Sequence, residues 1–146
     1  MENLNNIFVE KLINSDASWV KSIYKSEAKH LGTFNLFWTW DKYISGEAAY
    51  SFVGFRGMAF VRFGYSRKYK SYVIYEIGVH TDYKRQGLAK KLVISVSQIA
   101  KRKGTYLMLK CNQDNEVGNK FYASIGMTLK QTTATKKGEK QNVWTI

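Results

Sequence analysis

A strand, a short basic loop and an amphipathic helix follow one another after Tyr75, and this succession limits the folds open to the chain. The helix is predicted over Leu88–Lys103, where apolar residues recur at helical spacing and most basic residues lie off the apolar face. Gly104 then ends the helix. A buried strand is expected directly after it, over Thr105–Cys111. This order of elements predicts a mixed α/β domain.

Further strands and helices are predicted on both sides of this segment. Strands are expected at Ile7–Ile13, Ala48–Phe55, Met58–Tyr65, Ser71–His80, Met127–Thr133 and Gln141–Ile146. Arg56 and Gly57 provide the turn of an antiparallel hairpin. The chain has 146 residues and no linker-like segment, so we expect a single domain over residues 1–146.

Two helices are predicted in the first third of the chain. Asn14 or Ser15 is expected to cap the first helix, and Gly32 to end it. Its buried face consists of Val20, Ile23, Tyr24, Ala28 and Leu31. The second helix is aromatic-rich and spans Phe34–Tyr43. It is either a core helix or the aromatic wall of a substrate pocket.

Composition restricts the partners and the compartment. A net charge of +12 favours anionic partners, such as phosphates, nucleic acid or acidic proteins, without choosing among them. The single cysteine, Cys111, excludes an intramolecular disulfide and is typical of the reducing cytoplasm. The N-terminus lacks the features of a signal peptide, and no run of about 18 apolar residues predicts a membrane span. We therefore expect a cytoplasmic protein. No cluster of side chains has metal-ligand spacing, so no metal is expected.

The loop before the helix has the features of a phosphate site. The first amides of a helix lack intrahelical partners and carry the positive end of the helix dipole. Gly87 lets the backbone approach an anion, and Lys84 and Arg85 add positive charge. The Walker pattern and the dinucleotide fingerprint are both absent. The sequence therefore predicts a phosphate or pyrophosphate site of another kind.

Two segments resemble motifs of the GNAT (GCN5-related N-acetyltransferase) family. Ile77–Ala89 looks like its acetyl-CoA motif, an apolar strand and a turn followed by Q/R-x-x-G-x-G/A at the start of a helix. Asn115–Met127 looks like its second motif, N-x-x-A-x-x-hydrophobic-Tyr-x-x-x-G-F. The order of elements from Ile7 to Ile146 matches the family as well. The departures are Lys84 for Gln or Arg, Thr81 for proline, Gly118 for alanine and Met127 for phenylalanine.

The resemblance implies a fold, a co-substrate and a set of binding residues. The fold would be a mostly antiparallel sheet of six or seven strands with about four helices. A splayed parallel pair would lie at its centre, between the strands ending at His80 and Cys111. The co-substrate would be acetyl-CoA. Its implied binding residues are Ile77, Gly78, Val79, Lys84, Arg85, Gln86, Gly87, Leu88, Ala89, Lys90 and Asn115. Asn115 has a simple helix-capping role as its alternative.

The resemblance also implies direct attack of a primary amine on the thioester of acetyl-CoA. Tyr122 is the expected acid, because Val117, Phe121 and Ile125 are predicted to form the core face of the helix Asn115–Ile125 and leave Tyr122 about 100° away from Phe121.

Glu76 is the expected base, because burial among apolar strand residues would raise its pKa. A salt bridge to Arg62 is the alternative interpretation of Glu76. His80, which is better suited to a capping role, Asp114 and His30 are weaker candidates for the base, and Cys111 is not expected to be a nucleophile.

Other functions remain open from the sequence alone. The charge and the many aromatic residues suggest a nucleic-acid-associated protein, for example a tRNA-directed enzyme, although no nucleic-acid-binding motif is present. A non-catalytic binding protein with the GNAT fold is the third hypothesis. The sequence does not identify the amine acceptor, for which a small molecule and a protein, including an anionic one, are both open. A homodimer is compatible with the predicted C-terminal strands.

Overall fold

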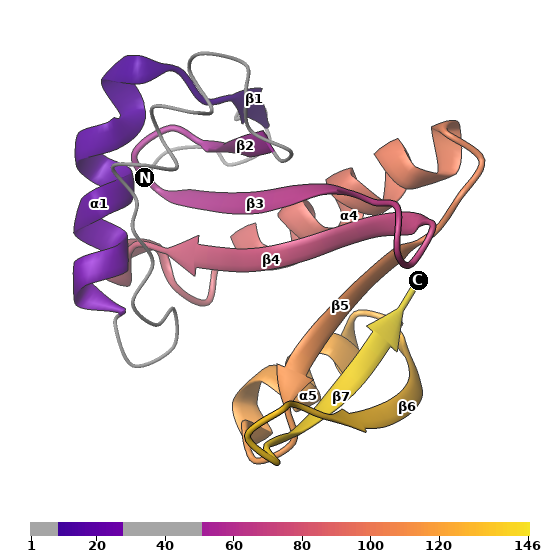
Figure 1. Ribbon diagram of the computed structural model, residues 1–146. Helices are drawn as coiled ribbons and strands as arrows, with labels where there is room; N and C mark the ends of the chain where they lie inside the picture. Colours follow the sequence, from indigo (N-terminus) through magenta and orange to yellow (C-terminus); the bar gives the residue numbers. More distant parts are fainter. Residues whose placement is uncertain (1–8, 28–50) are drawn as a thin grey trace. The chain divides into compact units, whose positions relative to one another are not determined.

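The computed structural model of the protein describes residues 9–27 and 51–146 (Figure 1). Within these residues, seven strands form one mixed sheet in the order β1-β2-β3-β4-β5-β7-β6. The strands are β1 (Glu10–Lys11), β2 (Ser51–Phe55), β3 (Ala59–Ser66), β4 (Ser71–Val79), β5 (Leu107–Asn112), β6 (Thr128–Ala134) and β7 (Lys140–Thr145). The helices within these residues are α1 (Ala17–Ser26), α4 (Leu88–Arg102) and α5 (Glu116–Ser124), with 3-10 turns η2 (Asn14–Asp16) and η3 (Thr81–Tyr83). The predicted α/β class is confirmed.

Most predicted elements lie within a few residues of their observed positions. The turn at Arg56 and Gly57 joins β2 and β3 as an antiparallel hairpin, in which Val53 faces Val61. The predicted helix Phe34–Tyr43 and the predicted helix end at Gly32 lie outside the described residues. Within residues 9–27 and 51–146, none of the helices has both the length and the apolar character needed to span a membrane.

The chain divides into two compact units, and each is described by itself. Of the described residues, the N-terminal unit comprises 9–27, 51–64 and Glu76–Ser95. The C-terminal unit comprises Tyr65–Tyr75 and Val96–Ile146. The strand β4 and the helix α4 each contribute residues to both units.

The N-terminal unit has an aromatic core between α1 and the strands. Its buried members include Leu12, Val20, Ile23, Tyr24, Phe52 and Phe60. The first strand is shorter than predicted among the described residues, since β1 ends at Lys11 and the side chain of Ile13 is 51% exposed. The predicted caps Asn14 and Ser15 are also wrong, because both belong to η2 and the α-helix begins only after Asp16.

The C-terminal unit is built from β5, β6, β7 and the first part of β4. Tyr72–Ile74 of β4 pair in parallel with Leu107–Leu109 of β5. β7 pairs antiparallel with both β5 and β6, and the register with β6 shifts between Leu129 and Gln131. The parallel pair that the resemblance implies is therefore present.

The side of α5 that lies against the sheet differs from the one predicted from its apolar pattern. Val117 is 82% exposed, so its place in the predicted core face is wrong. Gly118 faces β5 instead, because a Cβ at Gly118 would lie 2.9 Å from the Cys111 Sγ. Asn119 Oδ1 accepts hydrogen bonds from Asn142 Nδ2 at 3.0 Å and Trp144 Nε1 at 2.9 Å. A polar bonding network therefore decides which side of α5 lies against the sheet.

Candidate active site

The connection from β4 to α4 ends at Gly87, which directly precedes the helix and has no side chain that could act as its cap. The amide of Lys91 donates to the carbonyl of Gly87 at 3.1 Å, which is the first hydrogen bond of the helix. The amides of Leu88, Ala89 and Lys90 precede this bond, and Gly87 has no side chain to cap them. Such a helix start binds anions through its N–H groups and its dipole.

The conformation of the loop explains why Gly87 is a glycine. Its φ is +77°, in the left-handed region, whereas a Cβ built at this position would meet no protein atom within 4 Å. The backbone conformation and not a lack of room therefore requires glycine here. Arg85, two residues earlier, also has a positive φ of 64°. From Lys84 to Gly87 the loop is exposed.

The two basic residues of the loop differ in their partners. Lys84 Nζ forms an ion pair with Glu27 at the C-terminal end of α1. Arg85 has an exposed side chain. The predicted counter-charge is thus present in both residues, but the ammonium group of Lys84 also ties the loop to α1.

Gly78 has a packing role that the sequence did not reveal. A Cβ at Gly78 would lie 2.5 Å from Phe60 Cε1 and 2.8 Å from Ile23 Cγ2. The glycine therefore lets β4 approach the aromatic core of the N-terminal unit. Its neighbours Ile77 and Val79 are half-buried.

The carboxyl group of Glu76 is held between two side chains from other elements. Arg62 Nη2, from β3, donates to Glu76 Oε1 at 3.0 Å, and the Tyr24 hydroxyl, from α1, donates to Oε2. The side chains of Glu76 and Arg62 are only 13% and 11% exposed. Burial raises the pKa of Glu76 to about 8. Hydrogen bonds to the charged form of a carboxyl group favour a lower pKa.

The sequence left two interpretations of Glu76 open, a salt bridge to Arg62 and a base with a raised pKa, and the structure has a feature that agrees with each. The salt bridge to Arg62 is present. The pKa of the carboxyl group is also raised into the range of a useful general base. The sequence did not single out Tyr24 as a partner, because its spacing placed it with the core residues of the first helix. A buried tyrosine hydroxyl needs a partner, and this rule was the available signal.

His80 acts as a cap. Its Nδ1 accepts a hydrogen bond from the amide of Asp82 at 3.1 Å at the start of η3. The ring lies 5.7 Å from that of Tyr83, between centroids. These contacts agree with the capping role that the sequence favoured for His80.

In the C-terminal unit, Asn115 and Tyr122 lie on the same side of α5 as Gly118 and Asn119, at helical spacing. Asn115 Oδ1 accepts from the amide of Gly118 at 3.0 Å, so Asn115 is the N-cap of the helix. The alternative capping role of Asn115 is therefore present.

Tyr122 is half-buried against the sheet. Its ring centroid lies 5.3 Å from that of Phe121 and 6.4 Å from that of Trp144. Burial, and to a lesser degree the nearby Cys111, raises the pKa of Tyr122 to about 12. The same effect of burial, together with Asp114, raises the pKa of Cys111, which does not favour a nucleophilic thiolate.

The candidate residues thus fall into groups within each unit. The structure brings Glu76, Arg62 and Tyr24 into contact, and it joins the β4 end to the open start of α4 through η3. It places Asn115 and Tyr122 together on α5. The chemical groups available are a carboxyl group and a phenol with raised pKa values and the N-terminal amides of a helix.

A comparison with known families assigns the chain. Residues 7–127 match the family described as "Acetyltransferase (GNAT) family". The chain belongs to this GNAT family. It is therefore an acetyltransferase by family, and the resemblance of Ile77–Ala89 and Asn115–Met127 to the GNAT motifs is confirmed at the level of the family. No curated protein sequence matches the chain.

Solved structures of the GNAT family share the fold. A GNAT-family protein from Desulfovibrio desulfuricans superposes with a TM-score of 0.79 at 16% identity, over 96% of this chain and 98% of that one. The YncA protein of Salmonella typhimurium, solved with its cofactor acetyl-CoA, gives 0.69 at 16% identity, over 96% and 92% of the two chains.

The ribosomal-protein-S18-alanine N-acetyltransferase of Escherichia coli gives a TM-score of 0.69 at 19% identity, over 95% of this chain and 92% of that one. At these low sequence identities, the similarity to the solved structures shows a shared fold.

Proposed function

We propose that this GNAT protein transfers the acetyl group of acetyl-CoA to a primary amine by direct attack of the amine. The observation that carries the proposal is the open start of α4 at Gly87, in a chain of this family. The presence of acetyl-CoA in the structure of the Salmonella relative supports the choice of co-substrate. Acetyl-CoA supplies an activated acetyl group as a thioester.

The β4–α4 connection fits the pyrophosphate of acetyl-CoA. The amides of Leu88, Ala89 and Lys90 would bind it without competition from a side chain at position 87. Arg85, Gln86 and Lys90 have exposed side chains near this helix start, and two of them are cationic. In the proposed role, the backbone of Ile77, Gly78 and Val79 holds the pantetheine arm.

Glu76 is proposed to accept the proton of the attacking amine. An amine must be neutral to attack, and a base with a pKa near that of the ammonium group removes the proton efficiently. The pKa of about 8 brings Glu76 much closer to an alkyl-ammonium group than an ordinary carboxyl group is. Arg62 and Tyr24 hold the carboxyl in place, so their proposed role is positioning.

Tyr122 is proposed to donate a hydrogen bond to the departing sulfur. A phenol with a pKa of about 12 stays protonated at neutral pH. Complete transfer of its proton to a thiolate with an ordinary pKa of about 8.5 is unfavourable by roughly 5 kcal/mol. Tyr122 therefore stabilises the developing thiolate mainly as a hydrogen-bond donor, and its effect belongs to the chemical step.

Calorimetric titration of acetyl-CoA into the wild type and two glycine variants tests the first part of the proposal. Gly87→Glu places a carboxylate and a Cβ at the open start of α4. Gly104→Glu is the matched control, since Gly104 follows the other end of the same helix and also has a positive φ, of 75°, with no atom within 4 Å of a Cβ. We expect binding by the wild type and the control, and its loss in Gly87→Glu.

Release of the CoA thiol in the presence of a panel of primary amines tests the second part. Amine-dependent release that falls in Tyr122→Phe supports acetyl transfer. Binding of acetyl-CoA without amine-dependent release of thiol by any member of a broad panel would favour the non-catalytic hypothesis. Failure of the folded wild type to bind acetyl-CoA would contradict the proposal altogether.

A further inference from the structure

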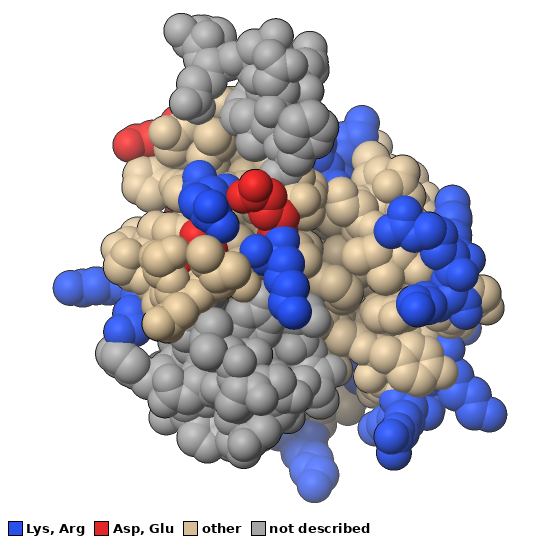
Figure 2. Space-filling view, turned by 90° about the horizontal axis from the view of Figure 1, so that it is seen from above, with Lys and Arg blue, Asp and Glu red and all other residues tan. Residues whose placement is uncertain are grey.

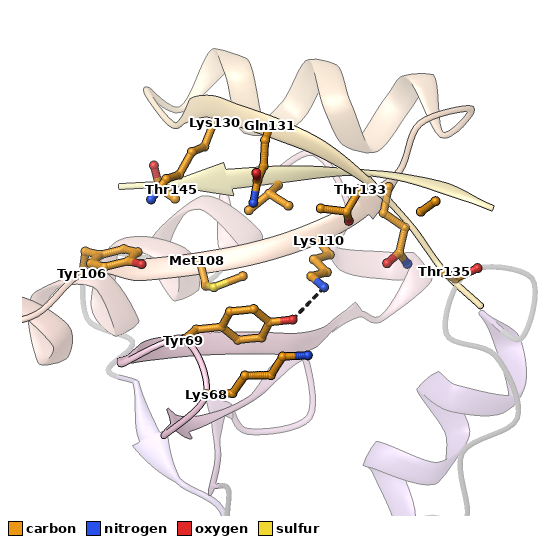
Figure 3. A pocket seen from close by; sticks show the side chains of 13 residues that line it. Lys68, Tyr69, Tyr106, Met108, Lys110, Lys130, Gln131, Thr133, Thr135 and Thr145 are labelled. Carbon is orange, nitrogen blue, oxygen red and sulfur yellow. Dashed lines mark hydrogen bonds between the residues drawn. The ribbon is translucent and has the colours of Figure 1, made fainter. Parts of the chain in front are cut away.

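A hollow lies over β5, β7 and β6 on the face of the sheet that α5 does not occupy. Successive residues of a strand point to opposite faces. Asn142 and Trp144 of β7 bond to α5, whereas Val143 between them lines the hollow together with Met108 of β5. The hollow has a volume of about 400 Å³, and Figure 3 shows the ring of Tyr69 near Met108, with its hydroxyl directed toward Lys110.

Three lysines from three different elements line the hollow. Lys68 precedes β4, Lys110 lies on β5 and Lys130 on β6. Among the described residues that line it, none is acidic. Figure 2 shows Lys and Arg side chains projecting from much of the described surface in one view, with few Asp and Glu among them. The hollow thus combines a local concentration of positive charge with the net charge of +12 of the chain.

Tyrosine rings accompany the lysines. The ammonium groups of Lys68 and Lys110 lie 5.2 Å and 5.1 Å from the ring centroid of Tyr69, and Lys110 Nζ donates to the Tyr69 hydroxyl oxygen at 2.8 Å. The ammonium group of Lys130 lies 5.5 Å from the ring of Tyr106.

A second hollow of about 300 Å³ shares Tyr69, Met108 and Lys110 with the first and adds Tyr75. Tyr75 and Tyr106 are 45% and 37% exposed. The two hollows therefore form one continuous surface, which we call the tyrosine–lysine face.

We propose that the tyrosine–lysine face binds single-stranded RNA. Lysines neutralise phosphates, and tyrosine rings stack with the unpaired bases that a single strand exposes. A sheet surface with exposed aromatic residues is a suitable platform for such stacking. A duplex keeps its bases inside the helix and cannot use the rings. An acidic peptide would leave the rings without a matching partner.

The other lining residues favour RNA over DNA. The side chains of Gln131, Thr133, Gln141 and Thr145 line the first hollow and offer hydroxyl and amide groups. These groups can donate to and accept from the ribose 2′-hydroxyl, which DNA lacks. The proposal concerns a surface of the C-terminal unit and does not depend on the acetyl-transfer chemistry.

Fluorescence anisotropy with a labelled oligouridylate of about ten nucleotides tests the proposal. The test variant carries Lys68→Gln, Lys110→Gln and Lys130→Gln. The control carries Lys25→Gln, Lys101→Gln and Lys120→Gln, three exposed lysines that do not line the hollow. Both variants lose the same net charge, so the comparison separates a local site from the general field of the protein. Circular dichroism checks that both remain folded.

We expect the test variant to lose roughly tenfold or more in affinity, while the control retains most of it. The dependence of log K on log salt should become less steep by about 2 in the test variant, because each lost phosphate contact removes about 0.7 from the slope. Tyr106→Leu, which keeps the charge, should weaken binding by roughly fivefold or more.

Three results would overturn the proposal. These are absence of oligouridylate binding by the wild type at low salt, equal loss of affinity in the two triple variants, and undiminished affinity in Tyr106→Leu. Equal affinity for an oligodeoxyuridylate of the same length would contradict the assignment to RNA in particular. A preference for duplex RNA would contradict the stacking argument.

Discussion

Two carboxyl groups of the N-terminal unit have little exposure to solvent, but their pKa values are shifted in opposite directions. Asp16 accepts hydrogen bonds from the Ile13 amide at 2.7 Å, from Trp19 Nε1 at 2.8 Å and from Arg56 Nε at 3.0 Å. Glu76 is bonded by Arg62 and Tyr24. Burial acts to raise the pKa of Asp16, but the donors together lower it below its ordinary value. The pKa of Glu76 is raised to about 8 by burial.

The difference arises from the local backbone. Asp16 lies in a turn before α1, where amides are free to donate to its carboxylate. Glu76 lies within a strand, where the backbone amides serve the sheet and only side chains can reach the carboxyl group. The comparison suggests that Asp16 is a structural anion and that Glu76 is a group able to exchange a proton near neutral pH.

The largest expected effect is on catalysis. Glu76→Gln retains the shape of the side chain but cannot accept a proton, so we expect kcat to fall roughly 100-fold or more, measured by release of the CoA thiol. Asp16→Asn should leave kcat nearly unchanged in the folded protein. It should instead lower the free energy of unfolding by roughly 1–3 kcal/mol in urea titrations, because the hydrogen bonds that the buried carboxylate accepts lose their charge, whereas Arg56 is half exposed and remains solvated.

The pH profile provides a control for this prediction. In the wild type, kcat should rise with pH, with a midpoint near pH 8. This midpoint should be the same for acceptor amines of different pKa. A limb that follows the pKa of each amine, together with a nearly unchanged kcat in Glu76→Gln, would mean that Glu76 only forms a salt bridge.

The next effect is on stability as a function of pH. The folded pKa of Glu76 is raised, so its contribution is fully present below about pH 4.5 and is lost as the pH rises to about 8. The free energy of unfolding should fall by ~2–4 kcal/mol over this range, and Glu76→Gln should flatten the curve. Asp16 has a lowered pKa, so its contribution is present above its unfolded pKa and is lost as the pH falls below that value.

Urea titrations at a series of pH values measure both slopes. If the free energy of unfolding of Glu76→Gln depended on pH between pH 5 and about 8 as that of the wild type does, the raised pKa of Glu76 would be contradicted.

A smaller effect is expected from Tyr24→Phe, which removes a hydrogen-bond donor to Glu76. The loss should cost about 1 kcal/mol of stability and move the limb of the pH–rate profile upward, because the donor favours the charged carboxylate. Thermal unfolding and the pH profile measure the two effects. A limb that moves downward would contradict the arrangement at Glu76.

The smallest effect is expected from Lys84→Met. Lys84 is partly exposed and paired with Glu27, so its removal should weaken acetyl-CoA binding by only about twofold to threefold in calorimetry. Arg85→Met serves as the comparison, because the side chain of Arg85 is exposed and its charge should contribute more to binding. A loss of all binding in Lys84→Met alone would show that the ion pair with Glu27 does not reduce its role.

The sequence predicted the elements whose periodicity is strong and local. The predicted bounds of the helix that begins at Leu88 and of the strand that contains Cys111 agree with the structure to within two residues. An amphipathic pattern defines the helix, and a run of apolar residues defines the strand. The motif around Gly87 was also predictable from the sequence, since its chemistry depends on a helix start and a glycine in the left-handed region.

Features that depend on side chains from distant elements were not predictable in the same way. The apolar pattern of α5 suggested Val117 as a core residue, but the network of Asn119 with Asn142 and Trp144 turns another side to the sheet. The bond of Tyr24 to Glu76 joins residues 52 positions apart. The tyrosine–lysine face likewise gathers residues from several elements, which no single segment of sequence reveals.

The most direct test of the account is a carbon-13 NMR titration of the side-chain carboxyl group of Glu76, with Asp16 as the reference in the same spectra. Both signals are identified by comparison with Glu76→Gln and Asp16→Asn. We expect Glu76 to titrate near pH 8 and Asp16 to titrate below its ordinary range. Titration of Glu76 at or below its ordinary value of about 4.3 would contradict the claim that this carboxyl group is prepared to accept a proton.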